Sequence, residues 1–264
     1  MQELFNSSAS FRAQLMRGGA GTLVTMVCGK LLLLAISAAL AHILGASQYG
    51  SYAFAMAVVG LLAIPLQLGF PQLLIRRSAI FQYRDQLSAL KGLLLSTNRI
   101  TLVSSIVFGG LAAVIILVLP VKIPAGTPET MLWALVLLPL LGLSGLRAAT
   151  LRGLGRIVWS LLPESMLQPL MLLLLLGATL LFAPAWTLTD TLAVQIHVIA
   201  QAFAFAVGIW LLYIALPAGI RNTEPQFDTA RWLREALPYL LLAGAPDHHP
   251  AYGHIDDWCF EIGF

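Results

Sequence analysis

The chain has 264 residues, of which 59% are hydrophobic and only 10% are charged. A soluble domain carries about 25% charged residues, so this chain could not cover its surface in water. Its apolar runs are continuous and much longer than the alternating segments of roughly ten residues that build a membrane barrel, so helices are expected. The composition therefore predicts an all-α membrane protein and excludes a soluble domain.

Six apolar runs are predicted to cross the bilayer as a six-helix transmembrane bundle within residues 20–216. They are residues 20–44, 52–74, 100–121, 131–146, 157–182 and 191–216. The first two are joined by the short turn GASQYGS (Gly45–Ser51), and each exceeds the roughly 20 helical residues that a hydrocarbon core requires. Pro65 predicts a kink within the second run.

The segments outside this bundle are polar or amphipathic. Residues 1–19 predict a short amphipathic helix on the cytoplasmic membrane surface, and residues 217–236 a cytoplasmic linker. Residues 237–264 are interpreted as an aborted seventh span and an atypical polar tail, because too few apolar residues follow Leu237 to cross a bilayer. This end is either a short cytoplasmic tail or the mark of a span lost to truncation or a frame change. The abrupt change in composition favours the second interpretation.

The basic residues orient the predicted bundle. Of the 15 lysines and arginines, 13 fall in the N-terminal segment or in the segments after the second, fourth and sixth runs, which include the predicted loop Arg147–Arg156. The positive-inside rule makes these segments, and with them the N-terminus, cytoplasmic. The net charge of +3 therefore reflects membrane topology, and no nucleic-acid partner is expected.

Lys30 is the one basic residue placed inside a predicted span. Ten helical residues from Ala20 put it about 15 Å into the membrane, where a charge costs roughly 2.5–3.5 kcal/mol on insertion scales. Intramembrane charges usually face a bundle interior or a wet cavity, which predicts a contact for an anionic substrate group. The alternatives are a structural ion pair with Glu164, or a span shifted so that Lys30 approaches the interface.

Two pairs of polar residues lie within predicted spans at i, i+4 spacing, so each pair shares one helix face. Glu164 and Gln168, flanked by two prolines, could line a cavity or carry a proton. The alternative is an interfacial helix turn in which Glu164 faces a nearby arginine. His197 and Gln201 are candidates for the same substrate path, and a histidine hydrogen-bonded between helices is the alternative.

Arg147 and the other arginines of its predicted loop could attract anionic headgroups or a diphosphate at the inner surface. Alternatively, they act only as determinants of topology. The short outer loops lack converging reactive groups, and the inner loops hold no paired base and nucleophile, so an enzyme is not expected. Neither a cofactor nor a metal site is expected, since the spacing of the histidines, acids and cysteine near the C-terminus matches no common ligand pattern.

The opening hairpin carries a family resemblance. The segment KLLLLAISAALAHILGASQYGSYAFAMAVVGLLAIPLQLGFPQLLIRR (Lys30–Arg77) combines a lysine in the first span, the turn LG-x-x-x-YG-x-Y, and LGF before two arginines. It resembles the start of bacterial polysaccharide-biosynthesis membrane proteins, which are oligosaccharide flippases of the multidrug/oligosaccharidyl-lipid/polysaccharide exporter superfamily. Beyond Arg77 the resemblance is mainly one of topology.

This resemblance implies a transporter of the bacterial inner membrane, with two six-span lobes around a central cavity. The chain would form the first lobe, and the second lobe is missing. The cargo would be a lipid-linked oligosaccharide of the undecaprenyl-diphosphate type, a polysaccharide or O-antigen precursor, handled among membrane lipids. Lys30 would face the diphosphate, and Arg147 would contact it where it enters. The alternatives are a drug or cation antiporter of the same superfamily, which would use Glu164, and an assembly-only or non-functional fragment.

Overall fold

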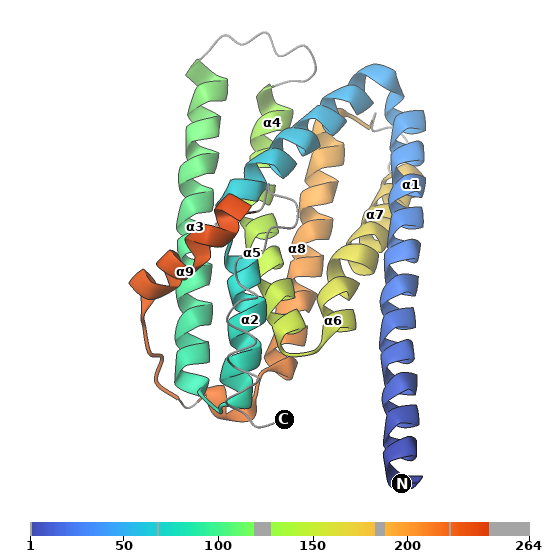
Figure 1. Ribbon diagram of the computed structural model, residues 1–264. Helices are drawn as coiled ribbons and strands as arrows, with labels where there is room; N and C mark the ends of the chain where they lie inside the picture. Colours follow the sequence, from blue (N-terminus) through green and yellow to red (C-terminus); the bar gives the residue numbers. More distant parts are fainter. Residues whose placement is uncertain (1, 68, 119–127, 183–187, 222, 243–264) are drawn as a thin grey trace.

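The computed structural model describes residues 2–67, 69–118, 128–182, 188–221 and 223–242 (Figure 1). Every regular element within these ranges is helical. The α-helices are α1 (Gln2–Leu66), α2 (Phe70–Tyr83), α3 (Leu87–Val118), α4 (Pro128–Leu135), α5 (Leu137–Gly153), α6 (Ile157–Leu162), α7 (Gln168–Phe182), α8 (Asp190–Ala215) and α9 (Thr229–Leu242). The shorter elements are the π-helical turn η1 (Pro163–Leu167) and the 3-10 turn η2 (Ala218–Arg221).

Five described helical segments are long and apolar enough to cross a membrane. They are Gly21–Leu66, Leu87–Val118, Pro128–Gly153, Ile157–Leu181 and Asp190–Ala215. Much of their apolar surface is uncovered, as on α3, where Ile106, Leu117 and Val118 are 64%, 67% and 72% exposed. Extended apolar surface of this kind meets lipid or another protein. The chain is therefore an all-α, multi-pass membrane protein.

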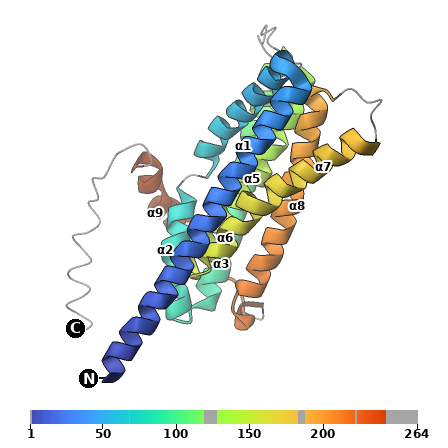
Figure 2. The ribbon, with the colours of Figure 1, turned by 90° about the vertical axis from the view of Figure 1, so that its right-hand side faces the viewer.

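The longest helix, α1, is bent into two arms at Gly45. The φ of 72° and ψ of 171° at this residue lie in a region that is essentially open to glycine alone. One arm rises beside α7, and the other returns obliquely toward the start of α2 (Figure 1). The predicted turn Gly45–Ser51 is wrong in extent, because Gly45 alone leaves helical geometry. Residues 2–19 continue the first arm without a break (Figure 2), so they do not form the separate helix that we predicted.

The predicted second run, residues 52–74, contains two helices. Helix α1 ends at Leu66, one residue after Pro65, and α2 begins at Phe70. Between them, Gly69 adopts a left-handed conformation with φ 73°, which redirects the chain. The predicted interruption of this run is present, but it lies at Gly69 and not at Pro65, which is inside α1.

Helix α5 overturns the predicted loop Arg147–Arg156. The helix continues to Gly153, since the residues after Arg147 are mostly good helix formers. It ends in a Schellman cap, in which Gly155 at φ 75° lets the Arg156 N–H donate to the Leu151 carbonyl at 2.9 Å. Arg147 consequently lies inside the bundle, where it is only 4% exposed.

The buried side chains form two apolar clusters. The first joins both arms of α1 to α4, α7, α8 and the start of α5. The second joins α2, the start of α3 and the end of α5 to α9, which contributes Trp232 and Ala236. Helix α9 is thus packed on the bundle, and our predicted boundary between residues 236 and 237 falls inside it. The polar tail beyond residue 242 and the outer-loop Lys122 lie outside the described residues.

Candidate functional site

A cleft of about 640 Å³ lies between the two arms of α1, the π-helical turn η1, and helices α7 and α8. Apolar side chains of α1 and α7 form much of its wall. Its polar lining consists of Lys30, Ser37, Tyr49, Tyr52, Glu164, Ser165, Gln168 and His197. Four of the six predicted site residues therefore meet in one cleft, although the sequence separates the first of them from the last by more than half of the chain.

Helix α1 approaches η1 very closely on one side of this cleft. A Cβ atom on Gly29 would lie 2.4 Å from the Ser165 carbonyl oxygen, so only glycine fits there. Pro169 has no N–H to donate to this carbonyl, which leaves the oxygen available to the Cα–H of Gly29. Single π-helical turns of this kind are frequent at functional sites. The contact fixes the next residue, Lys30, beside η1.

Lys30 lines the cleft and is exposed. Its neighbours on the same arm, Leu31, Leu33 and Leu34, are also exposed apolar residues, at 61%, 49% and 66%. Among the described residues, no carboxylate lies within ion-pair distance of the Lys30 ammonium. The ion pair with Glu164 that we considered from the sequence is therefore not formed. The ammonium remains able to bind an anion that enters the cleft.

Glu164 instead pairs with Arg147, which reaches it from behind the cleft wall. The Arg147 side chain is 3% exposed and the Glu164 side chain 31%, so the carboxylate faces the cleft and the guanidinium does not. Gly208 on α8 makes room for the guanidinium, since a Cβ there would lie 1.9 Å from Arg147 Nη1. The expectation that Arg147 contacts substrate at the inner surface is therefore wrong. It supports Glu164 from within the bundle.

A second polar chain crosses the cleft from α1 to α8 and then to α7. The Tyr52 hydroxyl lies 2.8 Å from His197 Nδ1, and Gln168 Nε2 lies 2.9 Å from His197 Nε2. If the Gln168 amide donates to Nε2, the neutral imidazole carries its proton on Nδ1 and donates it to the Tyr52 oxygen. Both ring nitrogens of His197 are thus hydrogen-bonded, and the histidine links α8 to α1 and α7.

Gln201 lies away from the cleft. Its side chain is fully buried, and its Nε2 donates to the Ser144 hydroxyl at 3.3 Å, which links α8 to α5. The alternative that we considered for this pair, a histidine hydrogen-bonded between helices, is what the structure has at His197, and Gln201 makes a further bond of this kind. His197, one turn earlier on the same helix, is the member of the pair that reaches the cleft.

Sequence reasoning missed four polar residues of the cleft, namely Ser37, Tyr49, Tyr52 and Ser165. The two tyrosines belong to the LG-x-x-x-YG-x-Y motif, which we interpreted as a turn and as part of the family resemblance, without assigning the tyrosines to the site. Their rings stack with centroids 6.3 Å apart on the second arm of α1. Motif tyrosines within an apolar helix were a usable signal, because a tyrosine there requires a hydrogen-bond partner for its hydroxyl.

The cleft thus combines apolar walls, several hydrogen-bonding groups and a lysine that has no ion-pair partner in the part of the chain that the structure describes. This combination suits an amphiphilic anion, whose chain would lie on the apolar side chains and whose charged group would meet Lys30. Comparison with family models, with curated protein sequences and with solved structures finds no significant match to the chain.

Proposed function

We propose that this chain forms one lobe of a flippase that carries a lipid-linked oligosaccharide across the bacterial inner membrane. The observation that supports this proposal is the position of Lys30. Its ammonium has no ion-pair partner among the described residues and lies at the edge of a mostly apolar cleft. An exposed cation within a membrane span is costly unless it meets an anion or water. A polyprenyl diphosphate offers both the anion and the apolar chain that this cleft would accommodate.

The proposed topology has six crossings with a cytoplasmic N-terminus. The apolar part of α1 has 46 residues, or about 69 Å of helix at 1.5 Å per residue, which is more than twice a 30 Å hydrocarbon core. The bend at Gly45 supports assigning each arm of α1 its own crossing. The start of α1, the turn from α2 to α3 and the end of α8 lie toward the same end of the bundle (Figure 1), which agrees with the clustering of basic residues in those segments.

A second lobe would face the cleft in the proposed transporter. The first arm of α1 is packed on one face only, with Thr25, Gly29 and Ile36 buried and with leucines and valines exposed around them. A partner lobe that covers this arm would enclose Lys30 between two bundles. This is the arrangement in which repeat-built transporters hold their substrates.

The ion pair of Glu164 disfavours the alternative, a drug or cation antiporter. Such a transporter would need an intramembrane carboxylate that is free to bind a cation or a proton. The Glu164 carboxylate already has Arg147 as its counter-ion. A cationic substrate would also be repelled by Lys30 in the same cleft.

Translocation in proteoliposomes tests this proposal. The chain would be reconstituted with its second lobe, and transfer of a fluorescent polyprenyl-diphosphate oligosaccharide between leaflets would be followed by a membrane-impermeant quencher. We expect Lys30→Ala to slow transfer about tenfold or more, because it removes a charge-assisted contact, and Lys30→Arg to retain most of it. Leu34→Ala is the matched control, an exposed residue of the same arm outside the cleft. Equal rates for Lys30→Ala and Leu34→Ala would contradict the proposal.

A further inference from the structure

A polar cluster lies behind the wall of the cleft, in the interface between α5 and α8. Ser144 and Arg147 are one turn apart on α5, and Gln201 and Gly208 are two turns apart on one face of α8. Gln201 Nε2 donates to Ser144 Oγ at 3.3 Å, and Gly208 leaves room for the Arg147 guanidinium. These groups therefore belong to a single contact between two helices of the bundle.

Three buried atoms of this cluster have no hydrogen-bond partner among the described residues. They are Arg147 Nε, Arg147 Nη1 and Gln201 Oε1. The Arg147 side chain is 3% exposed and Gln201 is fully buried, so solvent outside the bundle does not reach these atoms. A polar group closed off in this way inside a membrane-spanning bundle is costly and requires a partner.

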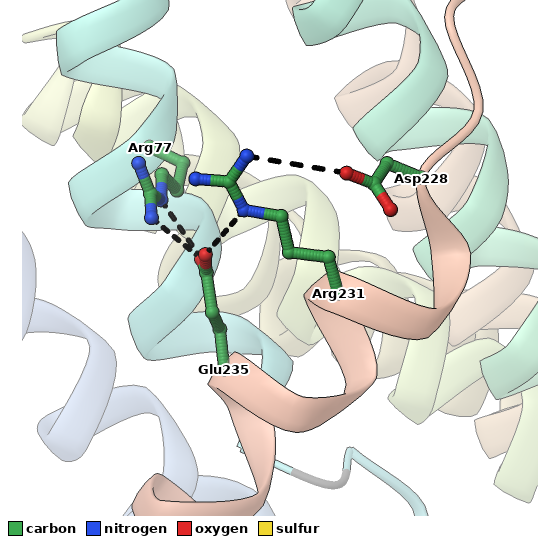
Figure 3. Close-up of polar contacts among 4 residues, drawn as sticks. All are labelled: Arg77, Asp228, Arg231 and Glu235. Carbon is green, nitrogen blue, oxygen red and sulfur yellow. Dashed lines mark hydrogen bonds and ion pairs between the residues drawn. The ribbon is translucent and has the colours of Figure 1, made fainter.

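The arginines of the ion-pair network between α2 and α9 are placed differently (Figure 3). Arg77 donates from Nε and Nη2 to Glu235 Oε2 at 3.0 and 2.7 Å. Arg231 donates from Nε to Glu235 Oε1 at 3.0 Å, and its Nη1 lies 4.0 Å from Asp228. The side chains of Arg77 and Arg231 are 27% and 64% exposed, so solvent reaches the N–H groups that the carboxylates leave over. Arg147, which is bonded to Glu164 through Nη2, has no such access.

The orientation of the Gln201 amide follows from its neighbours. The Ser144 hydroxyl also lies within hydrogen-bond reach of the Glu164 carboxylate, which only accepts. The single hydroxyl proton therefore goes to Glu164, and the Ser144 oxygen accepts from the NH₂ group of Gln201. The carbonyl oxygen of Gln201 is consequently an acceptor that needs a donor, whereas Arg147 offers donors that need an acceptor.

The chemistry of these three atoms selects their ligand. An anion would accept from Arg147, but Glu164 would repel it and Gln201 Oε1 would still lack a donor. A cation would be repelled by the guanidinium. Water carries no charge, accepts from Arg147 and donates to Gln201. Buried water molecules typically make about three hydrogen bonds to groups of this kind.

We infer that water is bound between α5 and α8, where it links Arg147 to Gln201 and is supplied from the cleft past Glu164. Gln201 is bonded to Ser144, which precedes Arg147 by about 5 Å along α5, a separation that one or two water molecules span. Glu164 lines the cleft with a side chain that is 31% exposed, so solvent in the cleft meets the buried cluster there.

Bound water at this position solvates the Arg147–Glu164 ion pair inside the membrane. The additional hydrogen bonds offset part of the cost of burying the guanidinium. The inference depends on the packing of α5 against α8, so it holds whether or not the chain is a flippase.

Water-edited solid-state NMR on the full chain in lipid bilayers tests this inference. Magnetisation passes from water to nearby side chains, and isotope-labelled arginines report its arrival at each Nε. The Arg147 signal is identified by its loss in Arg147→Lys. We expect Arg147 Nε to receive magnetisation as quickly as the exposed Arg231 Nε, because bound water lies within hydrogen-bond distance. Arrival as slow as at the exposed apolar side chain of Ile106 overturns the inference.

Two glutamine variants test whether the water is shared between the helices. We expect Gln201→Leu to slow the transfer to Arg147 Nε several-fold, because the water loses an acceptor. Gln195→Leu is the matched control, a partly exposed glutamine of the same helix outside the cleft, and it should leave the transfer unchanged. Equal transfer in the two variants would overturn the link from Gln201 to Arg147. Thermal unfolding shows whether each variant is folded, and the native chain alone decides whether water is present.

Discussion

Gly29 of α1 lies against the Ser165 carbonyl of η1 so closely that a Cβ on the glycine would be 2.4 Å from the oxygen. This contact joins the first arm of α1 to the π-helical turn and sets Lys30 at the edge of the cleft. Further along the same arm, Ile36, Leu40 and Leu44 pack into the first apolar cluster, so the Gly29 contact positions the part of the arm that carries Lys30.

Substitution of Gly29 tests the importance of this approach. We expect Gly29→Ala to destabilise the fold by about 1–3 kcal/mol, because the added methyl group must push two backbones apart. Denaturant unfolding in detergent micelles measures the change. Gly60→Ala is the matched control: Gly60 lies on the other arm of α1 with open space around its Cα, and alanine there should be neutral or stabilising. Equal effects at the two positions would contradict the close contact.

The bend of α1 depends on the backbone freedom of Gly45. We expect Gly45→Ala to cost about 1–3 kcal/mol, because a Cβ is strained at φ 72° and ψ 171°. The same unfolding measurement applies. Gly50 lies on the second arm, five residues beyond the bend, and a Cβ there would also meet open space, so Gly50→Ala should be tolerated. If Gly45→Ala left the stability unchanged, the bend between the two arms would not depend on the glycine-specific backbone conformation at residue 45.

The Arg147–Glu164 pair predicts an asymmetric pattern of mutant stabilities. We expect Glu164→Gln to destabilise the protein by about 3 kcal/mol, because it leaves a buried guanidinium without a counter-ion. Adding Arg147→Met should recover part of this loss, since the unpaired charge is then gone. Glu129→Gln, at an exposed carboxylate, is the control and should change little. A double variant less stable than Glu164→Gln alone would argue against the pair.

The hydroxyl of Tyr52 is predicted to contribute through His197. We expect Tyr52→Phe to lower the free energy of unfolding by about 1 kcal/mol, because it removes one partner from a buried imidazole. Thermal unfolding of the purified protein would show the shift. Tyr83, which is 91% exposed, provides the control substitution Tyr83→Phe, for which no change is expected. If both substitutions had the same small effect, the hydrogen bond would contribute nothing to stability.

Much of the architecture follows from the sequence, because a long apolar run satisfies its backbone hydrogen bonds within a membrane only by forming a spanning helix. The shared face of Glu164 and Gln168 was predictable from their i, i+4 spacing. An interruption of the second run was also expected, but at Pro65, whereas it lies at Gly69. The position of Arg147 was predicted wrongly because its charge suggested a loop, whereas the helix formers after it carry α5 on to Gly153.

The contact from Tyr52 to His197 could not be derived in this way. It joins residues 145 positions apart, and no local pattern specifies which helices become neighbours. The ion pair of Glu164 raised the same difficulty, since the sequence offered Lys30 and the nearby arginines as partners. Only the packing of α5 behind η1, with Gly208 making space, selects Arg147.

Direct binding of a polyprenyl diphosphate to the purified chain tests the central claim at Lys30. The affinities of a short-chain polyprenyl diphosphate and of the corresponding alcohol would be compared for the native chain, Lys30→Ala and Leu34→Ala. We predict that the native chain and Leu34→Ala prefer the diphosphate, and that Lys30→Ala loses about tenfold or more of this preference while still binding the alcohol. An unchanged preference for the diphosphate in Lys30→Ala would contradict the account.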